Sequence, residues 1–203
     1  MISDSTPWKD ELEKVADRLA KRKTQRRWTE RTSFLVERDI MVSAYALRKL
    51  HEAHKISDSF ASRQLKVTRH ELTGKIPDLH GRYSFWEHYD LDSGTDVTVS
   101  LATFYNQIIH SWVRALSATE QEELFDGIYV SSDRNRRKSV YFIAVDTLID
   151  VFRSVGVENV AEIAMARDKN GDMQYVQVLT DAESAARKTT VNPVRTTRQP
   201  PNH

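Results

Sequence analysis

The sequence predicts an α+β domain with a helical N-terminal half and an antiparallel sheet in the C-terminal half. Three observations lead to this prediction. Apolar residues recur at helical spacing up to about residue 55. Two pairs of β-rich segments follow after residue 126, each pair joined by a polar turn. A helical pattern lies between the two pairs, which indicates two hairpins and one helix packed against a face of their sheet.

The composition limits the classes of function. The 203 residues suit one domain, and the net charge of +1 gives no global field that would attract nucleic acid or a membrane. The absence of cysteine excludes disulfides, thiolate metal sites and cysteine nucleophiles. The N-terminus has no signal-peptide pattern, and no apolar run is long enough to span a bilayer. We therefore expect a soluble, cytoplasmic protein with no membrane partner.

The N-terminal half contains two helical patterns. Thr6 and Pro7 are typical of a helix start. An apolar stripe follows, formed by Trp8, Leu12, Val15 and Leu19. Residues 29–54 predict a second, longer helix, whose apolar side chains cover most of its circumference. A helix of that kind is expected at the centre of a fold, packed by several neighbours.

The middle of the chain predicts two strands and a third helix. Residues 63–72 and 97–101 alternate apolar and polar side chains, and the second of these strands leads directly into a helical pattern from Ser100 to Leu116. The Ser100 hydroxyl is a natural N-cap for this helix. Its apolar face would hold Leu101, Phe104, Tyr105, Ile108, Ile109, Trp112 and Leu116. Its opposite face would hold Asn106, His110 and Arg114, spaced four residues apart.

The C-terminal part predicts the two hairpins. Residues 127–132 and 139–145 form the first, and residues 160–167 and 173–179 form the second, around Asn170-Gly171. Between them, a helix capped by Asp146 would end at Gly156. We expect a single domain over 1–180, with a helical part at about 7–55, a mixed part at about 63–180, and a disordered tail at 181–203.

Three segments together resemble a family of uncharacterised bacterial proteins. They are ERDIMVSAYALRKLHEAHKISD, NQIIHSWV and DGIYVSSDRNRRKSVYFIAVDTLIDVFRSVG. The similarity spans roughly residues 7–180. It implies an α+β fold and assigns no activity.

The pair Asn106 and His110 is similar to the ribonuclease motif of HEPN-type domains, in which an arginine, often followed by asparagine, precedes a histidine. The resemblance implies His110 as a metal-independent acid or base, with Asn106 and Arg114 as supporting residues. It also implies a homodimer, because two chains of that family pool their motifs. This chain departs from the motif, because Tyr105 stands where the arginine belongs and Arg114 follows the histidine. A hydrogen bond to water or to a neighbouring segment is the simpler interpretation.

The sequence predicts no metal site and no cofactor. The densest set of metal-capable side chains comprises His70, His80, His88, Asp78, Asp90, Asp92 and Asp96, and its spacing matches no helix-borne ligand pair. A glycine-rich phosphate loop and a nucleophile elbow are also absent. We therefore interpret these histidines and aspartates as solvent-exposed residues of a loop.

Two basic clusters could contact phosphates. Residues 21–31 hold six positive charges and Trp28, which is also the composition of a helix C-terminus followed by a solvated segment. The turn of the first hairpin holds Arg134, Arg136, Arg137 and Lys138, and four cations within five residues repel one another unless solvent or an anion compensates. A polar turn is the simpler interpretation of this second cluster.

We therefore expect a non-catalytic protein that binds another protein or a nucleic acid. The hairpin turn and the polar face around His110 are the expected contact surfaces. The alternative is a ribonuclease of a toxin or defence system that resembles HEPN domains.

Overall fold

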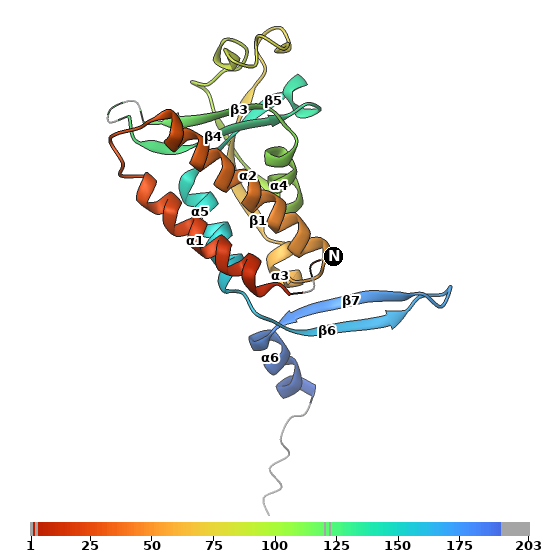
Figure 1. Ribbon diagram of the computed structural model, residues 1–203. Helices are drawn as coiled ribbons and strands as arrows, with labels where there is room; N and C mark the ends of the chain where they lie inside the picture. Colours follow the sequence, from red (N-terminus) through yellow and green to blue (C-terminus); the bar gives the residue numbers. More distant parts are fainter. Residues whose placement is uncertain (1, 3, 120, 122, 192–203) are drawn as a thin grey trace, which may run out of the picture.

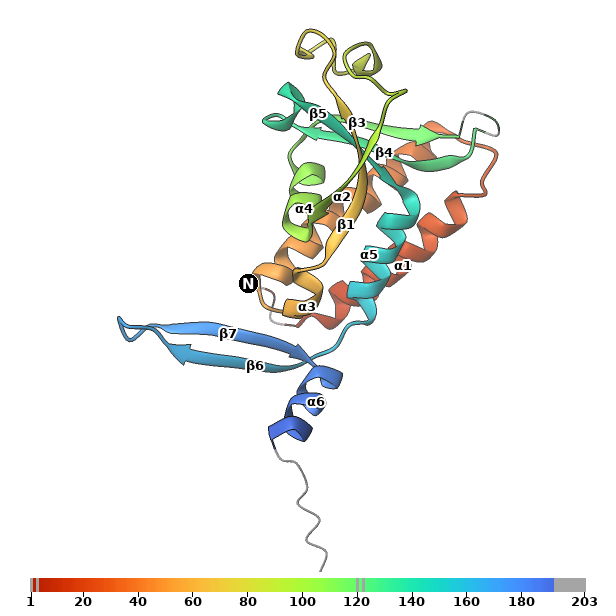
Figure 2. The same ribbon diagram turned by 180° about the vertical axis from the view of Figure 1, so that it is seen from behind.

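The computed structural model describes residue 2, residues 4–119, residue 121 and residues 123–191, and it has an α+β architecture (Figures 1 and 2). The main sheet has five strands in the order β2-β1-β5-β4-β3, and each neighbouring pair is antiparallel. These strands are β1 (Gln64–Glu71), β2 (Thr95–Ser100), β3 (Ser111–Ala118), β4 (Phe125–Ser132) and β5 (Ser139–Ala144). The predicted α+β class and the hairpin β4–β5 are confirmed.

Helices pack on one face of this sheet in two layers (Figures 1 and 2). Their bounds are α1 (Thr6–Arg22), α2 (Glu30–Glu52), α4 (Leu101–Ile109) and α5 (Val145–Val157), and the short α3 (Asp58–Ala61) lies near one end of the sheet. Helices α4 and α5 contact the strands directly, while α1 packs on α5 and α2 packs on α4. The long helix at 29–54 was thus predicted correctly in extent but not in position, because α2 lies in the outer layer.

The burial pattern of α2 explains this difference. Its buried apolar residues, among them Val36, Ile40 and Leu47, follow one helical face. Three other large apolar side chains of α2, Phe34, Val42 and Tyr45, are exposed. Apolar side chains around most of a helix therefore do not require burial on every side.

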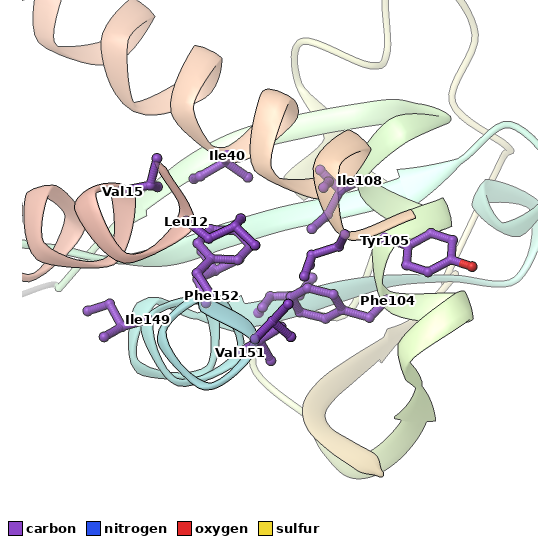
Figure 3. Packing of buried hydrophobic residues seen from close by; sticks show 14 of the residues in the cluster. Leu12, Val15, Ile40, Phe104, Tyr105, Ile108, Ile149, Val151 and Phe152 are labelled. Carbon is purple, nitrogen blue, oxygen red and sulfur yellow. The ribbon is translucent and has the colours of Figure 1, made fainter. Parts of the chain in front are cut away.

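The core lies between the sheet and the two helical layers. Phe104 of α4 and Phe152 of α5 are fully buried there, and Leu12 and Ile40 reach them from the outer helices (Figure 3). Each such side chain contributes about 2–3 kcal/mol by leaving water. Gly156 lies inside α5, which continues to Val157, and so it does not end the helix as predicted. The absence of a side chain at Gly156 allows α1 to pack closely, since a Cβ there would lie 3.1 Å from the Lys9 carbonyl oxygen.

The predicted helix over Ser100–Leu116 is wrong in its second half. Ser100 does cap α4, since its hydroxyl accepts the backbone N–H of Thr103 at 3.1 Å. The helix ends at Ile109, and the chain turns at His110 into β3, which pairs with β4. As a strand, this segment pairs its backbone groups with those of β4 and forms one edge of the main sheet.

The second predicted hairpin forms a separate sheet. Strands β6 (Val160–Arg167) and β7 (Met173–Thr180) pair with each other and project from the body as a ribbon (Figure 1). The main sheet was therefore not built from both hairpins as expected. Helix α5 runs along the sheet, so the chain leaves α5 at one end of the sheet. Only two residues separate α5 from β6, and they are too few for β6 to reach an edge of the main sheet.

The root of the ribbon is fixed by Glu158. Its carboxylate accepts the backbone N–H of Ser57 at 3.0 Å and the Ser57 hydroxyl at 2.5 Å. Its carbonyl oxygen accepts the Lys9 ammonium at 2.6 Å. One residue thus connects the root to α1 and to the start of α3.

After the ribbon, the chain forms α6 (Asp181–Val191), in the segment for which a disordered tail was expected. Ser184 of this helix donates to the Glu162 carboxylate at 2.6 Å, so α6 packs against the base of β6. The rest of the expected tail, 192–203, lies outside the described residues.

Candidate nucleic-acid interface

The loop 73–94 covers part of the sheet face that carries no helix. Phe85 and Tyr89 of this loop pack against Val113 of β3 and Val140 of β5 in a second apolar cluster. Burial raises the pKa of the Tyr89 hydroxyl to about 12. It therefore stays protonated, and it donates to the carbonyl oxygen of Arg136 at 2.8 Å, which joins the loop to the β4–β5 turn.

The β4–β5 turn is closely tied by its own hydrogen bonds. It forms a single 3-10 turn over Asn135–Arg137. The Asn135 amide donates to the carbonyl oxygen of Ser139 at 2.8 Å and to the hydroxyl of Ser131 at 3.2 Å. The positions of the four basic side chains are thus set by a defined backbone.

Arg136 differs from the other three cations of the turn. Its guanidinium pairs with Asp133 at 2.8 Å, donates to the carbonyl oxygen of Pro77, and lies 4.5 Å from the centroid of the Trp112 ring. Its side chain is only 15% exposed. Arg136 therefore connects the loop 73–94, the β4–β5 turn and β3. Its guanidinium is already engaged, unlike an exposed side chain that could contact a phosphate.

The other three cations, Arg134, Arg137 and Lys138, have exposed positions. Within the part of the chain that the structure describes, none of their side chains forms an ion pair. The nearby acid Asp133 is already engaged by Arg136. Three positive charges without an internal counter-ion thus lie at one end of the molecule.

Exposed aromatic rings lie on the loop beside this turn. Tyr83 is 68% exposed and Trp86 is 57% exposed, which is unusual for side chains of this size. The guanidinium of Arg82 lies 4.6 Å from the Tyr83 ring centroid and 5.8 Å from that of Trp112. A planar ring of a ligand can stack on such rings and guanidinium planes.

We call this region the aromatic–cationic surface. Its members are Arg82, Tyr83, Trp86, Trp112, Arg134, Arg136, Arg137 and Lys138. The loop and the turn that carry it lie together at one end of the molecule, opposite the ribbon (Figures 1 and 2).

A groove of about 380 Å³ adjoins the surface and is lined by both aromatic and charged side chains. The lining comprises Glu37, Met41, Arg82, Tyr83, Ile109, Ser111, Trp112 and Arg114. Two buried donors of these residues, the Nε–H of Arg82 and the Nε1–H of Trp112, have no acceptor among the described residues. Buried polar groups normally have a partner, so two unpaired donors mark this part of the fold as unusual.

The three residues proposed for catalysis do not share one helical face. Asn106 is on α4, and its carbonyl oxygen accepts the backbone N–H of His110 at 3.0 Å. His110 is exposed at the end of that helix. Arg114 is on β3 and pairs with Glu37 of α2 at 3.3 Å. Because α4 ends at Ile109, Arg114 does not lie on the same helical face as His110.

The first basic cluster, at residues 21–31, is partly used for internal contacts. Lys23 pairs with Asp146 at 2.6 Å, so Asp146 is engaged here and does not cap α5 as predicted. Trp28 donates from its indole N–H to the Ser33 hydroxyl at 2.7 Å and packs against Phe125. Trp28 is thus part of the fold, while Phe34, three residues after Arg31 on α2, is an exposed ring near this cluster in the sequence.

Two of the histidines considered as metal ligands contact backbone carbonyl oxygens. The His70 ring contacts the carbonyl oxygen of Asp90 at 2.9 Å, and the His88 ring contacts that of Lys75 at 2.7 Å. Among the described residues, no three His, Asp or Glu side chains are grouped as a metal site. In the same residues, no helix is both long and apolar enough to cross a membrane.

Arg82, Tyr83 and Trp86 were not predicted as site residues from the sequence. Four aromatic residues within seven positions, from Tyr83 to Tyr89, were the available signal in that loop. The chain matches no family model, no curated protein and no solved structure in the three comparisons. Its function is therefore argued from the geometry of this surface.

Proposed function

We propose that this protein binds single-stranded nucleic acid, with little sequence preference, through the aromatic–cationic surface. The observation that carries the proposal is the exposed Tyr83 ring, stacked on Arg82 beside the three unpaired cations of the turn. Proteins that bind single strands combine these two features. Cations follow the phosphates, and aromatic rings stack on bases, which every base permits because each has a π-face.

The groove beside these rings is lined by Tyr83 and Trp112. A duplex hides its base faces, whereas a single strand can turn a base toward Tyr83 and Trp86. These features favour a single-stranded ligand over duplex DNA.

The salt dependence of binding tests the cationic part. Fluorescence anisotropy with a labelled single-stranded oligonucleotide would give the dissociation constant at several salt concentrations. Three phosphate contacts on a single strand imply a log–log slope of about −2. Replacing Arg134, Arg137 and Lys138 with serine should bring the slope close to zero, while Arg136 is kept because it holds the fold.

A matched control removes the same charge elsewhere. Replacing Lys21, Arg26 and Arg27 with serine also removes three cations, but from the first basic cluster. This variant should keep the slope of the wild type. Equal loss in both variants would indicate a diffuse charge effect and would contradict the proposed surface, as would binding that does not respond to salt.

Tyr83→Ala tests the aromatic part. Stacking contributes about 1–3 kcal/mol per base, so affinity should fall roughly fivefold to more than a hundredfold. The salt slope should stay the same, since no cation is removed. Tyr45→Ala is the control, because this tyrosine is also exposed, to 48%, but lies on α2. Unchanged affinity in Tyr83→Ala would exclude stacking at this residue.

Ribonuclease activity is not part of this proposal. The HEPN-like interpretation relied on a continuous helix through Arg114, and α4 ends at Ile109. Cleavage of RNA that persists in EDTA and is lost in His110→Ala would restore that alternative.

A further inference from the structure

The groove beside the aromatic–cationic surface is built by four segments of the chain. The loop 73–94 supplies Tyr83, α2 supplies Glu37 and Met41, the end of α4 supplies Ile109, and β3 supplies Arg114. The volume of about 380 Å³ lies at the lower end of the range for small-molecule sites, about 300–1,000 Å³. This size suits a single flat ring system such as a nucleobase.

Glu37 gives the groove a negative charge that does not suit a phosphate. Its carboxylate can only accept hydrogen bonds, and a phosphate group beside it would meet a like charge. The edges of the bases, in contrast, carry N–H donors. The groove is therefore better suited to a base, while the exposed cations of the β4–β5 turn are suited to the phosphates.

The ion pair of Arg114 and Glu37 uses only part of the capacity of the two side chains. One guanidinium nitrogen of Arg114 donates to one carboxylate oxygen of Glu37 at 3.3 Å. Neither side chain makes another hydrogen bond within the part of the chain that the structure describes. The two side chains are 33% and 39% exposed, and such an exposed pair contributes little to stability. The second carboxylate oxygen and further guanidinium N–H groups can therefore exchange water for a ligand.

The pair presents N–H donors and carboxylate acceptors side by side. Guanine has the complementary order on its Watson–Crick edge, with the O6 acceptor followed by two adjacent donors, N1–H and the 2-amino group. A carboxylate can accept both donors at once. Adenine, cytosine and thymine each have a single donor group on that edge, and a single strand leaves the edge unpaired.

We infer that the groove binds a guanine base, with Glu37 accepting from N1–H and the 2-amino group and Arg114 donating to O6. Tyr83 lines the same groove, and its ring is 68% exposed, so the purine can stack on it. In the proposed complex this base belongs to the bound strand. The inference thus rests on the proposed function and adds to it one position that distinguishes the bases.

Fluorescence anisotropy with four labelled thymidine oligonucleotides tests the inference. One contains thymidine alone, and the others carry a single central guanine, adenine or cytosine. The guanine oligonucleotide should bind about tenfold or more tightly than the other three, because hydrogen bonds to a charged group distinguish it. Equal affinity for all four would overturn the inference and leave the proposed function intact.

Glu37→Gln tests the carboxylate. Glutamine keeps the size of the side chain but replaces one acceptor oxygen with an NH₂ donor, which would face the donors of guanine. The preference for guanine should fall to near parity, while affinity for the thymidine oligonucleotide should not fall, because no cation and no ring is removed. Glu30→Gln is the matched control, since it removes a carboxylate from an exposed position of α2 outside the groove. The control should keep the preference, and a Glu37→Gln variant that also keeps it would contradict the inference.

Two further probes leave the protein unaltered. Hypoxanthine lacks the 2-amino group, so an oligonucleotide with hypoxanthine in place of guanine should lose most of the preference, and unchanged affinity would count against the inference. Guanosine monophosphate presents the same edge without a strand. If it binds while no oligonucleotide does, the proposed function is wrong and the assignment of the groove stands. If neither binds, both are wrong.

Discussion

The guanidinium of Arg136 lies 4.5 Å from the centroid of the Trp112 ring, although the two residues belong to a turn and to the edge strand β3. The same guanidinium reaches the carbonyl oxygen of Pro77 in the loop 73–94. A residue that looks like one of four equivalent cations in the sequence thus joins three segments of the fold.

Arg136→Ala should therefore destabilise the protein, unlike substitution of its neighbours. Loss of the ring contact and of the hydrogen bonds should lower the free energy of unfolding by about 1–3 kcal/mol. Arg137→Ala, at an exposed position of the same turn, should change it by less than about 0.5 kcal/mol. Urea unfolding of both variants measures the difference, and equal values would show that Arg136 has no structural role.

Gly156→Ala should also destabilise the protein, although alanine is the better helix former. A Cβ at this position would lie 3.1 Å from the Lys9 carbonyl oxygen and 2.4 Å from the Glu13 side chain, so α1 and α5 would have to separate. We expect a loss of about 1–3 kcal/mol in thermal or urea unfolding. Gly74→Ala is the control, because no atom lies within 4 Å of its added Cβ. A stabilised Gly156→Ala variant would contradict the close packing.

Asp39 should make the stability sensitive to acid. Burial alone would raise the pKa of its carboxyl, but hydrogen bonds from Arg18 at 2.7 Å and from Arg38 outweigh burial and lower it. A carboxyl with a lowered pKa stabilises the fold above its unfolded value of about 3.9, and this stabilisation is lost as the pH falls below that value. The free energy of unfolding measured between about pH 5 and pH 2 should fall less in Asp39→Asn than in the wild type.

Ser100→Ala should weaken the start of α4. The hydroxyl accepts the backbone N–H of Thr103, and removal of such a cap costs about 1 kcal/mol. Ser93→Ala, in the exposed loop, should cost less than about 0.5 kcal/mol. Hydrogen exchange should show faster opening of the first turn of α4 in Ser100→Ala, and unchanged exchange there would mean that the cap is not needed.

Local patterns predicted most of the elements but not their arrangement. Helix α2, strands β1 and β2, and both hairpins follow from spacing and turn residues that lie close together in the sequence. The position of β1 between β2 and β5 depends on pairing between residues such as Thr68 and Phe142, which are far apart in the chain. Such pairing depends on tertiary packing, which the β-propensity of single residues does not predict.

The stretch after Ile109 shows why a helical pattern was misleading. Trp112 and Leu116 continue the four-residue spacing of α4, while Val113 and Ala115 fit the alternation of a strand. Pairing with β4 decides between the two, and the register shift between Ser111 and Val113 alters which side each residue faces. The prediction of Arg114 as a site residue depended on this stretch, and so did the apolar face predicted for Trp112.

Glu158 gives the ribbon a mechanical property. Its carboxylate is bound to Ser57 at the start of α3, and its carbonyl oxygen is bound to Lys9 of α1. Two further contacts hold the ribbon on the same side, the hydrogen bond of Val178 to Asp58 and the stacking of Tyr175 on His54. The ribbon should therefore move together with the helices of the body and not as a free hairpin.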